Sequence, residues 1–97
     1  MATFVTFLNW TEQGVKNIKD APNRAEAARK LLKKLGGELK QAYLMSGDTD
    51  VLLIAEAPDG EVMAKFALAI ASQGNVRTRT ARAWTEAEMQ KIIGSLP

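Results

Sequence analysis

The chain has 97 residues, of which 46% are hydrophobic and 25% are charged, and its formal net charge is +2. This length allows one domain, residues 1–97, with one modest core. It contains no cysteine and no histidine, which excludes disulfides, zinc–thiolate sites and catalysis by a histidine base. We therefore expect no metal site and no cofactor. No apolar run could span a bilayer, and the first ten residues lack a signal-peptide pattern, so we expect a cytoplasmic protein without a membrane partner.

The chain begins with a predicted strand over Ala2–Asn9, whose two faces are both largely apolar, as in a central strand. One face carries Phe4, Thr6 and Leu8, and the other carries Val5 and Phe7. Thr11 is a good N-cap for a short helix that runs to about Ile18.

A second helix is predicted over Arg24–Leu35, with apolar residues at helical spacing. The segment before it, which contains Pro22, breaks the pattern, and Asn23 with Glu26 resembles a capping box. Gly36 and the glycine after it are a strong stop signal, because glycine adopts the left-handed conformation without a steric penalty.

Two strands joined by an acidic turn occupy the middle of the chain. They are predicted over Glu38–Met45 and Asp50–Glu56, with the turn at residues 46–50 between them. Strict alternation in the first strand places Leu39, Gln41, Tyr43 and Met45 on one face, and Lys40, Ala42 and Leu44 on the other.

The last third of the chain shows clear start signals. Asp59 can cap the next helix, and Thr85 with Glu88 forms a second capping box. The remaining predicted elements are a helix over Gly60–Ser72, a strand over Val76–Trp84 and a helix over Glu86–Gly94.

This order, βαββαβ with an extra C-terminal helix, predicts an α+β, ferredoxin-like fold with a four-stranded antiparallel sheet and its helices on one face. The other face needs a cover, since its expected residues are too apolar for water. A second copy of the chain is the simplest cover, which predicts a homodimer or a higher homo-oligomer. The residues expected on that face include Phe7, Tyr43, Leu44 and Leu53.

Several blocks, in the same order along the whole chain, resemble the GYD-domain family. These blocks are Leu8–Gly14, Ile18–Pro22 with Arg24, Leu35–Lys40, Gly47–Val51, Glu56–Asp59 and Gly74–Thr78. The resemblance implies a ferredoxin-like, dimeric α/β-barrel fold, in a family without an established biochemical activity. Thr49 stands where the family's name motif has its aromatic residue, so the resemblance implies that any role of that ring is absent or moved here.

The acidic turn admits two interpretations. Gly47, Asp48 and Asp50 are typical of a β-turn, in which glycine supplies a positive φ and aspartate accepts backbone hydrogen bonds. Alternatively, two carboxylates at a strand end could serve as a base or a cation ligand. The turn interpretation is favoured, because two carboxylates without a histidine are weak evidence for a catalytic or cation-binding site.

Trp10, Tyr43 and Trp84 are three of only six aromatic residues. Aromatic side chains dominate cores and interfaces, so packing is the favoured role. The alternative is the wall of a ligand pocket, with an indole N–H or the tyrosine hydroxyl orienting a polar group.

Arg77 and Arg79 share one face of their strand, and Arg82 points the other way. Nucleic acid is not expected as a partner, because sheets that bind RNA stack bases on strand aromatics and this strand has none before Trp84. We expect the arginines to pair with nearby acids or with an anionic group across a dimer seam. The candidate acids are Asp48, Asp50 and Glu56.

These observations predict a homo-oligomeric ligand-binding or interaction module. Its candidate pocket consists of Trp10, Tyr43, Asp48, Asp50 and Arg77. The alternative is a cofactor-independent monooxygenase or isomerase of the dimeric α/β-barrel type, by analogy with the fold alone. A purely structural assembly unit is a third possibility, and the sequence leaves the question of enzymatic activity open.

Overall fold

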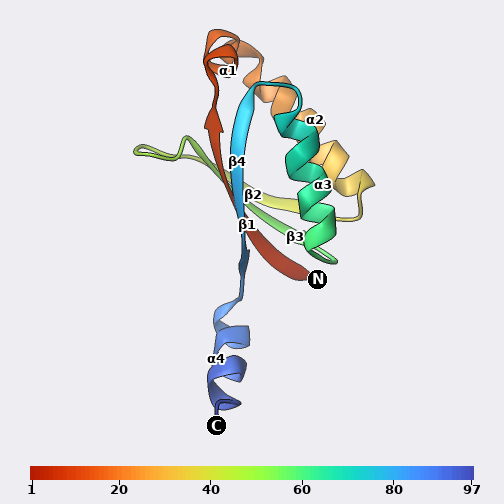
Figure 1. Ribbon diagram of the computed structural model, residues 1–97, viewed down its shortest axis with the longest axis vertical. Helices are drawn as coiled ribbons and strands as arrows, with labels where there is room; N and C mark the ends of the chain where they lie inside the picture. The colour runs from red at the N-terminus through yellow and green to blue at the C-terminus, as the bar shows by residue number, and fades with distance from the viewer.

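The computed structural model describes residues 1–97 and shows a four-stranded antiparallel sheet with two long helices on one face (Figure 1). The elements are β1 (Ala2–Trp10), α1 (Glu12–Lys16), the 3-10 helix η1 (Ile18–Asp20), α2 (Ala21–Lys34), β2 (Glu38–Leu44), β3 (Val51–Ala57), α3 (Gly60–Ala71), β4 (Val76–Ala83) and α4 (Glu86–Gly94). The strand order is β2-β3-β1-β4. This is the predicted ferredoxin-like α+β fold. None of the helices combines the length and the apolar composition that a membrane span requires.

The core lies between the sheet and helices α2 and α3. Leu32 of α2 and Phe66 of α3 are almost completely buried, and they meet the side chains of β1 and β3 that point toward the helices. Thr6, the one buried polar residue, shares a hydrogen bond of 2.9 Å with the hydroxyl of Thr80 on β4. The face of β1 predicted to carry Phe4, Thr6 and Leu8 is therefore the core face.

The other face of the sheet has no helix over it. Val5, Phe7, Leu52 and Ile54 are only partly buried there, and Tyr43 is 48% exposed. We call this surface the open face. Phe7 and Tyr43 lie on it as predicted.

Two further residues predicted for the open face lie on the opposite side. Leu53 is buried among the core residues. Leu44 pairs with Val51, which faces the helices, and it is 78% exposed near the end of the sheet. These two predictions were therefore wrong.

The grouping of side chains within β2 also differs from strict alternation, because the pairing of this strand contains an irregularity. The register of β2 against β3 shifts between Leu39 and Gln41, as at a β-bulge, where one strand carries an extra residue. Leu39 and Ala42 consequently both face the helices, opposite Ala55 and Leu53, while Gln41 and Tyr43 face the open side.

Helix α2 begins earlier than predicted. It starts at Ala21, with Pro22 in its first turn, where the missing N–H leaves no hydrogen bond unmade. Asn23 is therefore inside the helix and does not cap it; its amide donates to the Asp20 carboxylate at 3.0 Å instead. The predicted capping box of Asn23 with Glu26 was wrong. The stop signal is confirmed, because Gly36 follows the helix with a φ of 101°.

The other predicted caps are confirmed. The hydroxyl of Thr11 accepts from the N–H of Gly14, and the Asp59 carboxylate accepts from the N–H of Val62. Thr85 and Glu88 form the complete capping box. The N–H of Thr85 donates to the Glu88 carboxylate, which lowers the pKa of Glu88 below its ordinary value because this hydrogen bond favours the ionised form.

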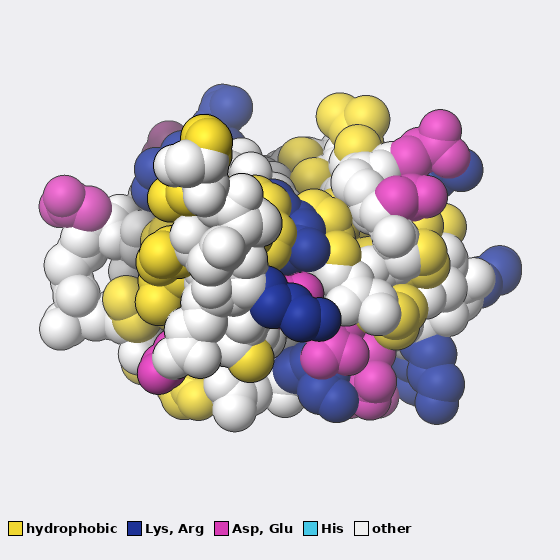
Figure 2. All heavy atoms as spheres, turned by 90° about the horizontal axis from the view of Figure 1, so that it is seen from below, with side chains coloured by type: hydrophobic (Ala, Val, Ile, Leu, Met, Phe, Trp, Pro, Cys, Tyr) yellow, Lys and Arg dark blue, Asp and Glu magenta, His cyan; other side chains and the backbone are white.

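Helix α4 projects from the end of β4, away from the sheet and from α2 and α3 (Figure 1). The view from below, with the C-terminal end toward the reader, shows hydrophobic side chains exposed between charged ones (Figure 2). The large hydrophobic residues exposed in this segment are Trp84, Met89, Ile92, Ile93 and Leu96. These exposed side chains show that α4 lacks the packing that usually stabilises a helix. Without such packing, a helix of nine residues is only marginally stable in water.

The α1 segment is held against the turn between α3 and β4. The N–H of Thr11 donates to the carbonyl of Asn75 at 3.0 Å, and the Thr11 hydroxyl donates to the carbonyl of Gly74 at 2.6 Å. Gly14 lies so close to this turn that a Cβ atom would stand 2.1 Å from the Asn75 carbonyl oxygen. Only glycine fits at this position without a backbone shift.

We predict that Gly14→Ala lowers the free energy of unfolding by about 1–3 kcal/mol, because the added methyl group must displace backbone atoms. Gly60→Ala is the matched control: nothing lies within 4 Å of its Cβ position, so stability should stay equal or rise by about 0.4–1 kcal/mol. Urea unfolding followed by circular dichroism, at equal protein concentration, measures both. Equal midpoints for the two variants would contradict the close contact at Gly14.

Candidate functional site

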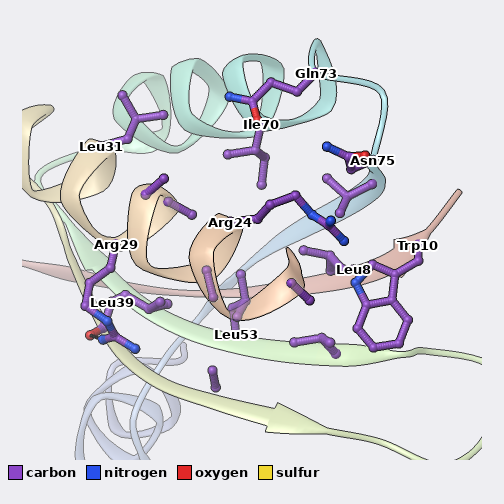
Figure 3. A pocket seen from close by; sticks show the side chains of 17 residues that line it. Leu8, Trp10, Arg24, Arg29, Leu31, Leu39, Leu53, Ile70, Gln73 and Asn75 are labelled. Atoms are coloured by element: carbon purple, nitrogen blue, oxygen red, sulfur yellow. Dashed lines mark hydrogen bonds between the residues drawn. The ribbon is translucent and has the colours of Figure 1, made fainter. Parts of the chain in front are cut away.

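A cavity of about 350 Å³ lies between α2 and the core face of the sheet (Figure 3). Its walls are mostly aliphatic side chains from the strands and α3, chiefly Leu8, Leu39, Val51, Leu53, Ile70 and Val76. On α2 the residues that line it include Ala21, Ala25 and Ala28, three or four positions apart. These small side chains leave room between the helix and the sheet that larger ones would fill.

The polar groups of the cavity lie mainly at one end. Figure 3 shows the Arg24 guanidinium between Asn75 and Trp10, with Gln73 at the rim above. Arg29 is the other charged lining residue, and its guanidinium is turned toward Leu39, where it donates to the backbone carbonyl at 3.1 Å. The cavity is thus an apolar chamber with a hydrogen-bonding end.

Segments that are distant in sequence build this polar end. Arg24 donates from Nη1 to the carbonyl of Asn17 at 2.8 Å and from Nη2 to the carbonyl of Gly14 at 3.3 Å. The Gln13 amide donates to Asn75 Oδ1 at 3.0 Å. The α1 segment therefore positions both Arg24 and Asn75.

The acidic turn between β2 and β3 is fastened to the end of β1. The Asp50 carboxylate accepts from the N–H of Trp10 at 2.9 Å. The Asn9 side chain completes the contact, since its Oδ1 accepts from the N–H of Asp50 at 2.9 Å and its Nδ2 donates to the carbonyl of Asp48 at 3.0 Å. Gly47 has a φ of 118°, as the turn interpretation requires. Asp50 acts here as a backbone clamp for Trp10.

Trp10 and Asp50 are in contact, but the five predicted pocket residues do not form one pocket. Trp10 lines the cavity, whereas Tyr43 and Arg77 belong to the open face and Asp48 and Asp50 to the turn. The Tyr43 hydroxyl donates to the Gln41 side chain at 2.9 Å. A role for these residues in ligand binding stays a prediction.

Sequence reasoning did not identify Arg24, Gln73 and Asn75 as cavity residues. The alanines of α2 were a usable signal, because small residues on the core face of a helix indicate space beneath it. No local pattern connects Arg24 with Asn75, since their proximity depends on how α1 packs against the turn after α3.

The predicted ion pairs of the β4 arginines do not form within the chain. Neither Arg77 nor Arg79 pairs with Asp48, Asp50 or Glu56. The Arg79 guanidinium lies instead over the Phe7 ring, 5.1 Å from its centroid. Pairing with these three acids was therefore wrong, and an anionic partner across a dimer interface stays a prediction.

On the core side of β4, Arg82 has several partners. Its guanidinium lies 4.6 Å from the centroid of the Trp84 ring and 4.0 Å from the Glu88 carboxylate. These contacts link the end of β4 to the start of α4.

We predict that Asp50→Ala lowers the free energy of unfolding by about 1–3 kcal/mol, because the Trp10 N–H loses its acceptor in a partly buried position. Asp48→Ala removes a neighbouring carboxylate without a side-chain hydrogen bond, so it should change stability by less than about 0.5 kcal/mol. Urea unfolding measures both variants, and equal losses would argue against the clamp.

A protein of Thermus thermophilus, the glutamine synthetase and cystathionine beta-lyase binding protein, is 29% identical over 90 residues, which cover 92% of this chain and 95% of that protein. Two solved structures share the fold. One is the transcriptional regulator NMB0573 of Neisseria meningitidis in complex with L-Met, at a TM-score of 0.62 and 21% identity over 88% of this chain. The other is TTHA0845 of Thermus thermophilus, at a TM-score of 0.56 and 21% identity over 88% of this chain.

The extents of these matches differ. The chain spans about half of the length of the Neisseria regulator, 51%, but 95% of TTHA0845.

The sequence model of the GYD domain matches residues 4–93. This range includes both long helices, most of α4 and every strand except the first two residues of β1. The chain therefore belongs to the GYD domain family.

Proposed function

We propose that this protein is a homo-oligomeric module that binds a small-molecule ligand in the cavity between α2 and the sheet. The observation that carries this proposal is the cavity itself, because an apolar chamber of about 350 Å³ with a few convergent polar groups is the usual form of a small-molecule site. One comparison supports ligand binding, because the Neisseria regulator of the same fold was solved with L-Met. The Thermus relative is named for binding two enzymes, which supports interaction with protein partners.

The size of the exposed surface supports self-association. A compact monomer of 10.6 kDa is expected to expose about 5,500 Å², whereas this chain exposes 6637 Å². The excess of roughly 1,100 Å² is more than the ~800 Å² that each partner buries in a standard interface. A second copy is the partner that this area fits, since both the open face and α4 are unpartnered in the same chain.

The open face and α4 supply the two apolar surfaces of the proposed assembly. On the open face, Phe7 lies at the centre, opposite Leu52 on β3 and Arg79 on β4. Helix α4 adds the exposed side chains of Ile92 and Ile93. Burial of both surfaces against a second copy would remove the exposed apolar area and give α4 the packing that it lacks.

The enzymatic alternative has less support from the cavity. Proton transfer requires a titratable group that faces the bound substrate, and the candidates are Asp48, Asp50, Glu56 and Tyr43. None of them lines the cavity, whose charged residues are both arginines. Arginine does not exchange protons at neutral pH, so the arrangement favours binding over acid–base chemistry.

Native mass spectrometry of protein purified gently from its own host tests the proposal directly. We expect at least twice the 10.6 kDa chain mass, with a small molecule retained per chain. An oligomer without added mass, both before and after incubation with metabolite extract, would count against ligand binding. A monomer would count against the proposed assembly.

We predict that Phe7→Asp dissociates the oligomer, because it places a charge at the centre of the proposed interface on the open face. Leu68→Asp is the matched control, since Leu68 is 72% exposed on α3, away from the open face. Size-exclusion chromatography with light scattering measures the mass of both variants. If Phe7→Asp kept the wild-type mass, the open face would not be the interface.

A further inference from the structure

We infer that the ligand of the cavity is a small carboxylic acid with an aliphatic or aromatic tail, and that its carboxylate binds at Arg24. This inference rests on the proposed ligand-binding function and specifies the chemistry of that site. Three properties of the cavity carry it: the hydrogen-bonding character of its polar end, the charge placed there, and the apolar walls beyond.

The groups available at the polar end are almost all donors. The indole N–H of Trp10 makes no hydrogen bond within the chain, and its nitrogen lies on the edge of the ring that faces Arg24 (Figure 3). Asn75 has its carbonyl oxygen engaged by Gln13, which leaves the amide NH₂ group available. Only the Gln73 side chain, exposed at the rim, offers an acceptor as well. Such an end selects a ligand group that accepts hydrogen bonds.

The charge at this end is a cation without an anionic partner. Arg24 is partly buried and forms no ion pair. A guanidinium has five N–H donors, and only two of those of Arg24 are engaged, by the carbonyls of Asn17 and Gly14. These two bonds also hold the side chain in place, so a carboxylate would meet a preorganised donor group.

Between Arg24 and Arg29 the walls of the chamber are apolar, which disfavours a further charge on the ligand. Leu8, Leu53, Ile70 and Val76 surround the space beyond Arg24 together with the alanines of α2. A polar tail would lose its hydration there without compensation. The volume of about 350 Å³ is near the lower end of the usual range for ligand pockets, which favours a small tail. Arg29 is exposed and its guanidinium points to the Leu39 carbonyl, so we place the carboxylate at Arg24.

The two tryptophans provide a direct readout. Trp10 lines the cavity, whereas Trp84 lies beyond the end of β4 and does not, so the two indole N–H signals in a ¹H–¹⁵N spectrum of the full-length protein separate cavity binding from surface binding. We propose titrating the protein at neutral pH with 4-methylpentanoate and, separately, with its neutral isostere 4-methylpentanamide. We expect the acid to shift the Trp10 signal and leave Trp84 unchanged, and the amide to bind roughly tenfold more weakly.

Three arginine variants locate the carboxylate. Arg24→Gln keeps amide donors near the Asn17 and Gly14 carbonyls but removes the charge, so the affinity for the acid should fall roughly tenfold, to the level of the amide. Arg77→Gln removes the same charge from the open face and should leave the affinity unchanged, whereas Arg29→Gln removes it from the other end of the cavity and should lower the affinity less than Arg24→Gln does. If Arg24→Gln does not fold, Arg24→Lys retains the charge and should bind the acid better than the amide.

Ala28→Leu separates failure of this inference from failure of the proposed function. The larger side chain occupies part of the chamber, so binding of both probes should weaken strongly while the spectrum remains that of a folded protein. Equal affinity for acid and amide would overturn the carboxylate inference and leave the cavity as a ligand site. A loss of acid binding in Arg29→Gln but not in Arg24→Gln would overturn the placement. If neither probe shifted the Trp10 signal, both the carboxylate inference and the proposed ligand-binding function of the cavity would be overturned.

Discussion

The constraint on which this structure depends is that the sheet is apolar on both faces, while the helices of a βαββαβ chain cover only one of them. Right-handed crossovers place α2 and α3 on the same side, where they bury the core residues of β1 and β3. The face with Val5, Phe7, Leu52 and Ile54 has no cover within the chain. Helix α4 does not cover this face either, because it projects away from the sheet instead of folding back onto it (Figure 1). We propose that a second copy of the chain covers these exposed apolar surfaces.

The cavity exists because α2 does not fill the space between itself and the sheet. Alanines on the inner face of α2 lower the amount of core that the helix can fill, and the resulting space is kept open by contacts at its end. There, α1 is fastened to the turn after α3 through Thr11, Gly14 and Asn75, and Arg24 is fastened to α1. The same contacts that complete the fold thus produce the donor-rich end of the cavity.

Much of the fold could be predicted because its signals are local. Thr11, Asp59 and the pair Thr85–Glu88 cap helices through hydrogen bonds that span only a few residues, so they can be read in the chain itself. The start of α2 was misread for a related reason, since proline is compatible both with a break and with a first helical turn. Less of the candidate site could be predicted: Trp10 lines the cavity, but Arg24 and Asn75 were not recognised.

By itself, the sequence determined the order of the elements, their fold class and the excess of apolar surface, because periodicity, caps and turns depend on neighbouring residues. The tertiary structure decided which residues meet. The bulge in β2 became visible only against β3, since the face of a strand residue is defined by its partner strand. The clamp of Asp50 on Trp10 joins residues 40 positions apart, and the polar end of the cavity joins α1, α2 and the start of β4. Such contacts depend on three-dimensional packing, which no local pattern encodes.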